Sequence, residues 1–320
     1  MSEFFKVDNG TFSPNNKYFI NNVSFKIFNK GDIISLLGPS GVGKTSILRT
    51  IAGLDKLIDG EIWLDKQLIS SKNFNLQPEK RGVSLTFQNN CLFPHMNLKQ
   101  NIMISKQGGL NINEVDHLIK NFYLKDMVDK FPHEVSSGEA QRAALIRSIV
   151  SNPKLLLLDE PLSALDPFLR IEMRSELKAL QRQLGITFVH VTHSQEEAMA
   201  LSDLVLVMNA GQVEQQGTPI ELFSKPRNSF VAQFIGGHNV IHLKGNLVSV
   251  REDRIKISSG GRDKITSVEY LGSTVRLKVK TSAGQLTVIQ SDTEFSKLKL
   301  EPGDPVKTSW SKKDQIPLEA

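Results

Sequence analysis

The chain has 320 residues, of which 39% are hydrophobic and 23% are charged, a composition typical of a soluble globular protein with about two domains. No apolar stretch reaches the roughly 20 residues of a membrane-spanning helix, and the opening MSEFFKVDNG does not resemble a signal peptide, so we expect a cytoplasmic protein. Cys91 is the only cysteine, which excludes an internal disulfide and a cysteine-based zinc site.

The charge is only slightly basic, with 39 lysines and arginines against 34 acidic residues. Residues 236–320 hold 14 of those basic residues and 10 of the acidic ones, so most of the excess lies in the last quarter of the chain. It is scattered and forms no basic run of the kind that marks a nucleic-acid-binding surface.

The first 30 residues predict strands of an antiparallel layer. From residue 31 onward, short apolar runs alternate with helical stretches. The runs at 32–38, 154–160 and 186–193 each precede a helical pattern, which predicts buried parallel strands joined by helical crossovers. Residues of about 89–150 contain few strand signals and predict an inserted helical subdomain.

The character of the chain changes again after residue 235. In TVRLKVK the apolar residues at 275, 277 and 279 alternate with basic residues at 276, 278 and 280, a period of two with one solvent-facing side. We therefore predict an α/β nucleotide-binding domain at 1–235 and a small all-β barrel at 236–320.

Residues 38–46 read GPSGVGKTS and match the phosphate-loop pattern G-x-x-x-x-G-K-[ST], between an apolar strand and an amphipathic helix. Glycines let backbone N–H groups surround phosphates, the lysine adds a cation at the β and γ groups, and the threonine can hold Mg²⁺. The predicted nucleotide-binding residues are Gly38, Pro39, Ser40, Gly41, Val42, Gly43, Lys44, Thr45 and Ser46.

Asp159 and Glu160 end the apolar run LLLLDE, at the sheet edge where ligands of open parallel sheets gather. Alone, this run would more readily be a core strand followed by solvated acidic residues. A phosphate loop in the same sheet makes a catalytic role for the two carboxylates the favoured interpretation. We expect Asp159 in the Mg²⁺ shell and Glu160 orienting or deprotonating the attacking water.

His193 ends the strand ITFVHVT at the same edge, and Gln88 follows another apolar run. Each is a weak signal alone, because single histidines and glutamines are usually structural or solvated. His190 and His193 have no third ligand nearby in the sequence, which argues against a metal pair.

These motifs together resemble the ATP-binding cassette family, whose fold is a P-loop NTPase cassette with a parallel core sheet, an antiparallel β layer and a helical subdomain. VSSGEAQRA at 135–143 is similar to the family signature L-S-G-G-Q, FQNNCLFPHMNLKQNI to its Q-loop, LLLLDEPLSALDPFLR to its Walker B and D-loop segments, and HVTHSQEEAMALSD to its H-loop.

The resemblance implies a head-to-tail dimer of two copies that holds two ATP molecules between them. Ser136 and Gly138 would meet the γ-phosphate of ATP held by the partner, and Asp166 would cross the interface. Gln88 would act as a Mg²⁺ ligand and, with His193, position the γ-phosphoryl group. Phe12 is the first candidate for stacking on adenine. Tyr18 is the second.

Two departures from the signature concern its contact with phosphate. Ser137 replaces the first glycine, and Glu139 replaces the glutamine. The serine restricts close approach of the backbone, and the carboxylate repels the triphosphate although it suits the helix dipole.

The segment QGTPIELFSKPRNSFVAQFIG resembles the end of the cassette in importers fed by a solute-binding protein, whose cargoes include polyamines, ferric iron, sulfate and sugars. Those importers carry an OB-like regulatory (TOBE) domain, which the last 85 residues resemble. The resemblance implies two membrane permease subunits as partners, docked near residues 91–101, and a peripheral position on the cytoplasmic face of the inner membrane.

A cassette ATPase of nucleic-acid maintenance or translation is the alternative. The 47 residues between Gln88 and Ser136 are too few for the long coiled coil of chromosome-condensing members, and translation members usually carry two cassettes per chain. Arg276, Lys278 and Lys280 could line a groove, but few aromatic residues accompany them for base stacking. We therefore do not expect nucleic acid as a partner.

Overall fold

The computed structural model describes residues 3–13, 20–87, 91–105, 109–243 and 245–319. The chain divides into two compact units, Met1–Pro219 and Ile220–Ala320. The boundary expected from sequence, after residue 235, lies further along the chain, at the end of the helix that precedes the strands of the second unit.

The first unit contains a mostly parallel six-stranded sheet. Its strands, in spatial order, are β11 (Gln212–Gly217), β10 (Leu204–Asn209), β3 (Ile33–Leu37), β9 (Thr187–Thr192), β8 (Leu155–Asp159) and β7 (Val83–Thr86). Only β11 pairs antiparallel. All five residues of β3 and of β8 are buried, as expected for strands covered on both faces.

An antiparallel layer forms the second sheet of this unit, as the first 30 residues predict. Its order is β2 (Ile20–Ile27), β1 (Phe5–Phe12), β4 (Asp59–Leu64), β5 (Gln67–Ser71) and β6 (Phe74–Asn75). Buried residues alternate with more exposed ones along much of β2, so that one face of the layer packs inward.

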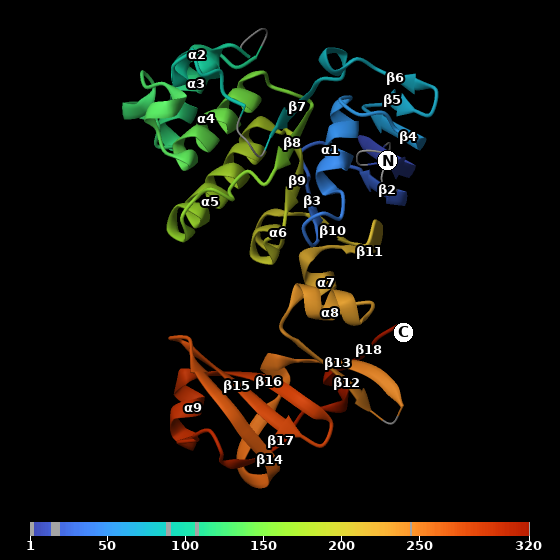
Figure 1. Cartoon of the computed structure of the whole chain (residues 1–320), viewed down its shortest axis with the longest axis vertical. Helices are drawn as coiled ribbons and strands as arrows, with labels where there is room; N and C mark the ends of the chain where they lie inside the picture. Colours follow the sequence, from blue (N-terminus) through green and yellow to red (C-terminus); the bar gives the residue numbers. More distant parts are fainter. Residues whose placement is uncertain (1–2, 14–19, 88–90, 106–108, 244, 320) are drawn as a thin grey trace. The chain divides into compact units, whose positions relative to one another are not determined.

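Six α-helices accompany these sheets among the described residues: α1 (Lys44–Ala52), α2 (Leu98–Met103), α3 (Ile112–Asn121), α4 (Ser137–Val150), α5 (Pro167–Leu184) and α6 (Gln195–Leu201). In Figure 1 the green helices α2–α5 lie on one side of the parallel strands and the blue antiparallel layer on the other. No helix in the described ranges is long and apolar enough to cross a membrane.

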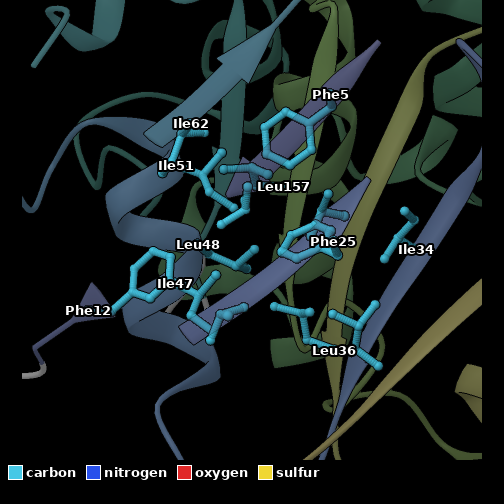
Figure 2. Close-up of a cluster of buried hydrophobic side chains, with 14 of the residues drawn as sticks. Phe5, Phe12, Phe25, Ile34, Leu36, Ile47, Leu48, Ile51, Ile62 and Leu157 are labelled. Atoms are coloured by element: carbon cyan, nitrogen blue, oxygen red, sulfur yellow. The ribbon is translucent and has the colours of Figure 1, made fainter. Parts of the chain in front are cut away.

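Alternate residues of β8 enter two hydrophobic cores. Leu155 and Leu157 join α1 and the antiparallel layer in one core, whereas Leu156 and Leu158 join the helices of the other. Figure 2 shows Leu157 within the first core. The carboxyl end of β8 is thereby fixed between two packed layers. The predicted α/β cassette fold is confirmed.

The second unit is built mainly of strands. Helices α7 (Pro219–Ser224) and α8 (Ser229–Ile235) precede a sheet of β12 (His238–Leu243), β13 (Asn246–Arg251) and β18 (Gln315–Pro317). A second sheet contains β16 (Gly284–Ser291), β15 (Thr274–Thr281), β14 (Lys256–Tyr270) and β17 (Pro305–Ser309), accompanied by α9 (Asp292–Leu298). Val275, Leu277 and Val279 of β15 are fully buried, as the period of two predicts.

A buried arginine stabilises the end of α1. Arg81 is 2% exposed, and Nη1 donates to the carbonyl oxygens of Thr50 (3.0 Å) and Ile51 (2.8 Å) in the last turn of that helix. Nε donates to the Leu76 carbonyl at 2.8 Å. Burial lowers the pKa of Arg81 to about 10, which still leaves it charged at neutral pH.

Replacing Arg81 by methionine should lower the free energy of unfolding by about 3 kcal/mol, because several buried carbonyl groups lose their donor. Chemical denaturation measures this loss. Arg81→Lys keeps the charge but not the planar fork and should give an intermediate value. A methionine variant as stable as the parent would contradict this capping role.

Candidate functional site

The phosphate loop connects β3 to α1 and depends on glycine at three positions. Gly41 and Gly43 have φ angles of 81° and 96°, which strain residues with a side chain. Gly38 is required for a different reason, since a Cβ atom there would lie 2.5 Å from the carbonyl oxygen of Met208. Helix α1 begins directly after the loop, which puts the N–H groups of its first turn where phosphate can meet them.

Lys44 places a buried cation inside this loop. Its side chain is 6% exposed, and Nζ donates to the carbonyl oxygens of Gly38 at 2.7 Å and Pro39 at 2.8 Å. Burial lowers the pKa of Lys44, while the nearby charges of Glu160 and Asp159 act in the opposite direction. A phosphate oxygen would offer this ammonium group a stronger partner than a carbonyl does.

Thr45 and Asp159 lie side by side at the start of α1 and the end of β8. Thr45 Oγ1 donates to Asp159 Oδ1 at 3.2 Å, and Asp159 is 5% exposed. Burial raises the pKa of Asp159, an effect opposed by the Thr45 hydrogen bond. These hard oxygen donors fit Mg²⁺, which usually takes one or two protein ligands and completes its shell with phosphate and water.

Glu160 follows Asp159 and has an unusual backbone. Its φ is 50°, and its N–H donates to the Val191 carbonyl at 3.0 Å, which ties the end of β8 to β9. Its Oε1 lies 3.2 Å from Nδ1 of His193. The structure thus brings together two of the predicted catalytic side chains.

A cavity of about 290 Å³ opens at this edge of the sheet. Its lining combines the phosphate loop with the end of β8 and β9: Ser40, Gly41, Gly43, Lys44, Thr45, Ser46, Glu160 and Val191. The predicted phosphate-binding residues and the predicted catalytic carboxylate, Glu160, therefore share one cavity. Among the described residues, this lining does not include Ser136, Gly138 or Asp166.

The signature segment forms the N-terminus of α4. Ser136 caps the helix and forms a capping box with Glu139, whose Oε2 accepts from both N–H and Oγ of Ser136 at 2.7 Å. These two hydrogen bonds lower the pKa of Glu139. Glu139, which replaces the usual glutamine, therefore accepts a hydrogen bond from the Ser136 hydroxyl. The family resemblance predicts that this hydroxyl contacts the γ-phosphate instead.

Helix α4 packs closely against the loop that follows Glu160. A Cβ atom on Gly138 would lie 3.0 Å from Leu165 Cδ2, so a larger residue there would require the Leu165 side chain to shift. One turn later, Gln141 is 5% exposed and bridges this loop. Its Nε2 donates to the Glu160 carbonyl at 3.0 Å, and its Oε1 accepts from Ala164 N–H at 3.1 Å.

Gln141 was not among the site residues predicted from the sequence. The available signal was a polar residue next to Arg142 on a helix that continues as AALI, but a buried polar residue is rarely distinguishable from a solvated one without the fold. Asp166, which was predicted, caps α5 by accepting from Phe168 and Leu169 N–H groups.

The prediction that Phe12 stacks on adenine does not fit the structure. Phe12 is 0% exposed and belongs to the core between the sheets, where Figure 2 shows it near Ile47. Gly10 makes this possible, because the ring occupies the space in which a Cβ atom would sit, 2.8 Å from the nearest ring atom. Gln88 and the second candidate, Tyr18, lie outside the described residues.

Comparison with known proteins follows the same division into two parts. Residues 20–163 match the family model described as ABC transporter, and residues 248–318 match the TOBE domain. The chain is 38% identical over 306 residues to "Spermidine/putrescine import ATP-binding protein PotA" of Bacillus thuringiensis (strain Al Hakam), covering 90% of this chain and 91% of that protein. The chain belongs to the ABC transporter family. The predicted resemblance is confirmed, and the chain is an ABC-type ATPase.

Another relative and two solved structures agree. The protein of the same name from Haemophilus ducreyi is 47% identical over 237 residues, covering 72% of this chain and 62% of that protein. A structure of cbiO1 from Clostridium perfringens, part of the ABC transporter complex cbiONQ, aligns with a TM-score of 0.60 and 28% identity, covering 70% of this chain and 91% of that one. The cassette MJ0796, in a dimeric post-hydrolysis state with ADP and Pi, aligns with a TM-score of 0.58 and 26% identity. The alignment covers 67% of this chain and 98% of that one.

Gln141→Leu should lower ATP turnover by about tenfold while ATP binding changes little. Leucine cannot form hydrogen bonds with the Glu160 carbonyl or the Ala164 N–H, so the loop that begins at Glu160, here called the catalytic turn, is no longer held in position. The contacts of the phosphate loop are unchanged. Steady-state ATPase assays and equilibrium binding of a fluorescent ATP analogue separate the two effects. Equal turnover in the variant and the parent would show that Gln141 does not position the turn.

Proposed function

We propose that the chain is the ATP-hydrolysing subunit of an importer of polyamines such as spermidine and putrescine. The single observation behind this cargo is the 38% identity over 90% of the chain to a protein whose name states spermidine/putrescine import. The site supports the catalytic part of the proposal, since Lys44, Thr45, Asp159, Glu160 and His193 lie at one edge of the parallel sheet.

In this mechanism the phosphate loop holds ATP through its backbone N–H groups and Lys44 Nζ, which exchanges carbonyl partners for phosphate oxygens. Thr45 and Asp159 would hold Mg²⁺, with Gln88 as a further ligand. When bound, Mg²⁺ would supply neutralisation of the phosphate charge. Glu160 orients the attacking water and accepts its proton at a carboxylate oxygen.

His193 completes the site from β9. Its imidazole lies 3.2 Å from Glu160 and has 56% of its side-chain surface exposed, so it can turn toward a γ-phosphate oxygen. Hydrolysis in this arrangement requires positioning and charge stabilisation more than covalent participation by the protein.

A second copy of the chain completes each nucleotide site in the proposal. Ser136, Gly138 and Asp166 lie on α4 and the adjoining loop, and would reach ATP held by the partner. The dimeric solved cassette supports this arrangement. ATP binding would close the dimer, and hydrolysis would reopen it.

Membrane permease subunits are the proposed external partners, with a solute-binding protein delivering cargo to them. The loop after residue 91 suits a docking role because it is exposed yet held in place. Phe93 is 42% exposed, and Asn101 accepts from its N–H at 2.7 Å and donates to its carbonyl at 3.1 Å. The chain would then sit peripherally at the cytoplasmic face of the inner membrane.

Uptake of labelled spermidine and putrescine in cells lacking this gene tests the cargo. Expression of the parent chain should restore uptake, whereas Glu160→Gln should not, because it removes the base while leaving ATP binding intact. Purified Glu160→Gln should also remain dimeric in ATP. Restored uptake of ferric iron or a sugar instead of polyamines would contradict the cargo, and undiminished ATPase activity of Glu160→Gln would contradict the mechanism.

Glu139→Gln should strengthen the ATP-dependent dimer by up to about tenfold, because a carboxylate no longer faces the triphosphate and the neutral amide oxygen is a weaker acceptor for the Ser136 hydroxyl. The Glu160→Gln background prevents hydrolysis while dimerisation is measured against ATP concentration. Glu114→Gln is a matched control, since Glu114 forms the same capping box with Asn111 on α3. A weaker dimer in Glu139→Gln would contradict this reading.

A further inference from the structure

A network of buried polar side chains connects β3, β9 and α6 next to the loop that carries His193. Ser35, Thr192, His190, Glu197 and Ser202 are 0%, 1%, 1%, 4% and 6% exposed. Polar groups at this depth destabilise a protein unless they are hydrogen-bonded to one another. The mechanism above uses none of these side chains.

His190 joins three elements of the fold. Its Nδ1 lies 2.9 Å from Ser35 Oγ on β3, and its Nε2 lies 3.1 Å from Glu197 Oε1 on α6. Ser35 Oγ also contacts Ser202 Oγ, just after α6. A neutral imidazole satisfies both contacts if the Ser35 hydroxyl donates to Nδ1 and Nε2–H donates to Glu197.

Glu197 holds the backbone on both sides of His193. Its Oε2 accepts from Thr192 Oγ1 at 2.7 Å, and Thr192 Oγ1 in turn accepts from the Ser194 N–H at 3.0 Å. The Glu197 N–H donates to Ser194 Oγ at 3.2 Å. Because more than half of the His193 side chain is exposed, these backbone anchors do more to fix its position than packing does.

The electrostatics keep Glu197 ionised within this network. Burial raises the pKa of Glu197, but the interaction with His190, the Thr192 hydrogen bond and the charge of Arg170 lower it by more, so that the net pKa lies below that of an ordinary glutamate. A carboxylate accepts hydrogen bonds at both oxygens, as the contacts to His190 and Thr192 require.

The network also links His193 to the phosphate loop. Ser35 is the strand partner of His190 and lies on β3, the strand that leads directly into Gly38. A displacement of Glu197 would therefore change the spacing between the loop that holds the phosphates and the histidine proposed to contact the γ-phosphate. Misplacement of a reacting group by about 1 Å can cost about 100-fold in rate.

We infer that Glu197, held by His190, is a positioning residue that sets the place of His193 relative to the phosphate loop. This inference rests on the proposed role of His193 at the γ-phosphate. Glu197 acts through the loop 192–194 and touches neither ATP nor the attacking water.

Glu197→Ala should lower the single-turnover rate of ATP hydrolysis by at least about tenfold, with the KM for ATP within about twofold of the parent, because the phosphate-loop contacts are intact. Glu197→Gln keeps the size and one acceptor and should recover a large part of the rate. In a His193→Ala background, Glu197→Ala should cause no further loss, because the side chain that it positions is gone.

His238→Phe serves as the matched control for His190→Phe. His238 is likewise buried at 8% exposure and makes two contacts, to Ser249 Oγ at 2.6 Å and the Phe223 carbonyl at 2.7 Å, but it belongs to the second unit. Both phenylalanine variants should lose stability, and only His190→Phe should lose turnover. Thr192→Val removes a single hydroxyl and provides a milder test if the larger changes prevent folding.

An equal loss from Glu197→Ala with and without His193 would overturn the inference, as would a rise in KM that accounts for the whole effect. Failure of the proposed function has a different signature: the parent chain would then hydrolyse ATP at a rate unaffected by Glu160→Gln.

Discussion

The buried ammonium group of Lys44 is the interaction on which the rest of the site depends. A cation that is 6% exposed is stable only when surrounded by oxygen atoms, and the loop supplies two carbonyls while Asp159 and Glu160 add negative charge nearby. Strand β3, helix α1 and strand β8, which carry these groups, are held by one shared hydrophobic core. The proposed site is therefore organised in the absence of nucleotide, and ATP binding would exchange the carbonyl partners of Lys44 for phosphate oxygens.

The parallel sheet explains why such distant segments meet. Strands β3, β8 and β9 end at one edge, and each ends in a residue of the site or leads directly into one. The strained backbone of Glu160 and the bridging side chain of Gln141 then connect this edge to α4, whose N-terminus is the signature segment. A displacement of the signature segment would consequently be transmitted to the loop that follows Glu160 through the hydrogen bonds of Gln141.

Sequence patterns were sufficient for features that are local in the chain. The phosphate loop, the buried strands and the period of two in β15 each follow from residue spacing, and the structure contains them. Phe12, predicted to stack on adenine, is instead buried, because a glycine two residues earlier leaves room for the ring in the core. The contacts of Gln141 and the His190–Glu197 pair join residues that only the packed fold makes neighbours, so no spacing in the sequence indicates them.

In the proposed dimer, each ATP-binding site combines the phosphate loop of one copy with the signature segment at the start of α4 of the other. Mixing two inactive variants tests this directly. Lys44→Ala has a defective phosphate loop, and Ser136→Arg places a bulky side chain at the N-terminus of α4. In a mixed dimer, one nucleotide site would combine both intact halves. We expect each variant alone to be inactive and the mixture to hydrolyse ATP. A mixture without activity despite demonstrated formation of the mixed dimer, or full activity of Ser136→Arg alone, would contradict this arrangement.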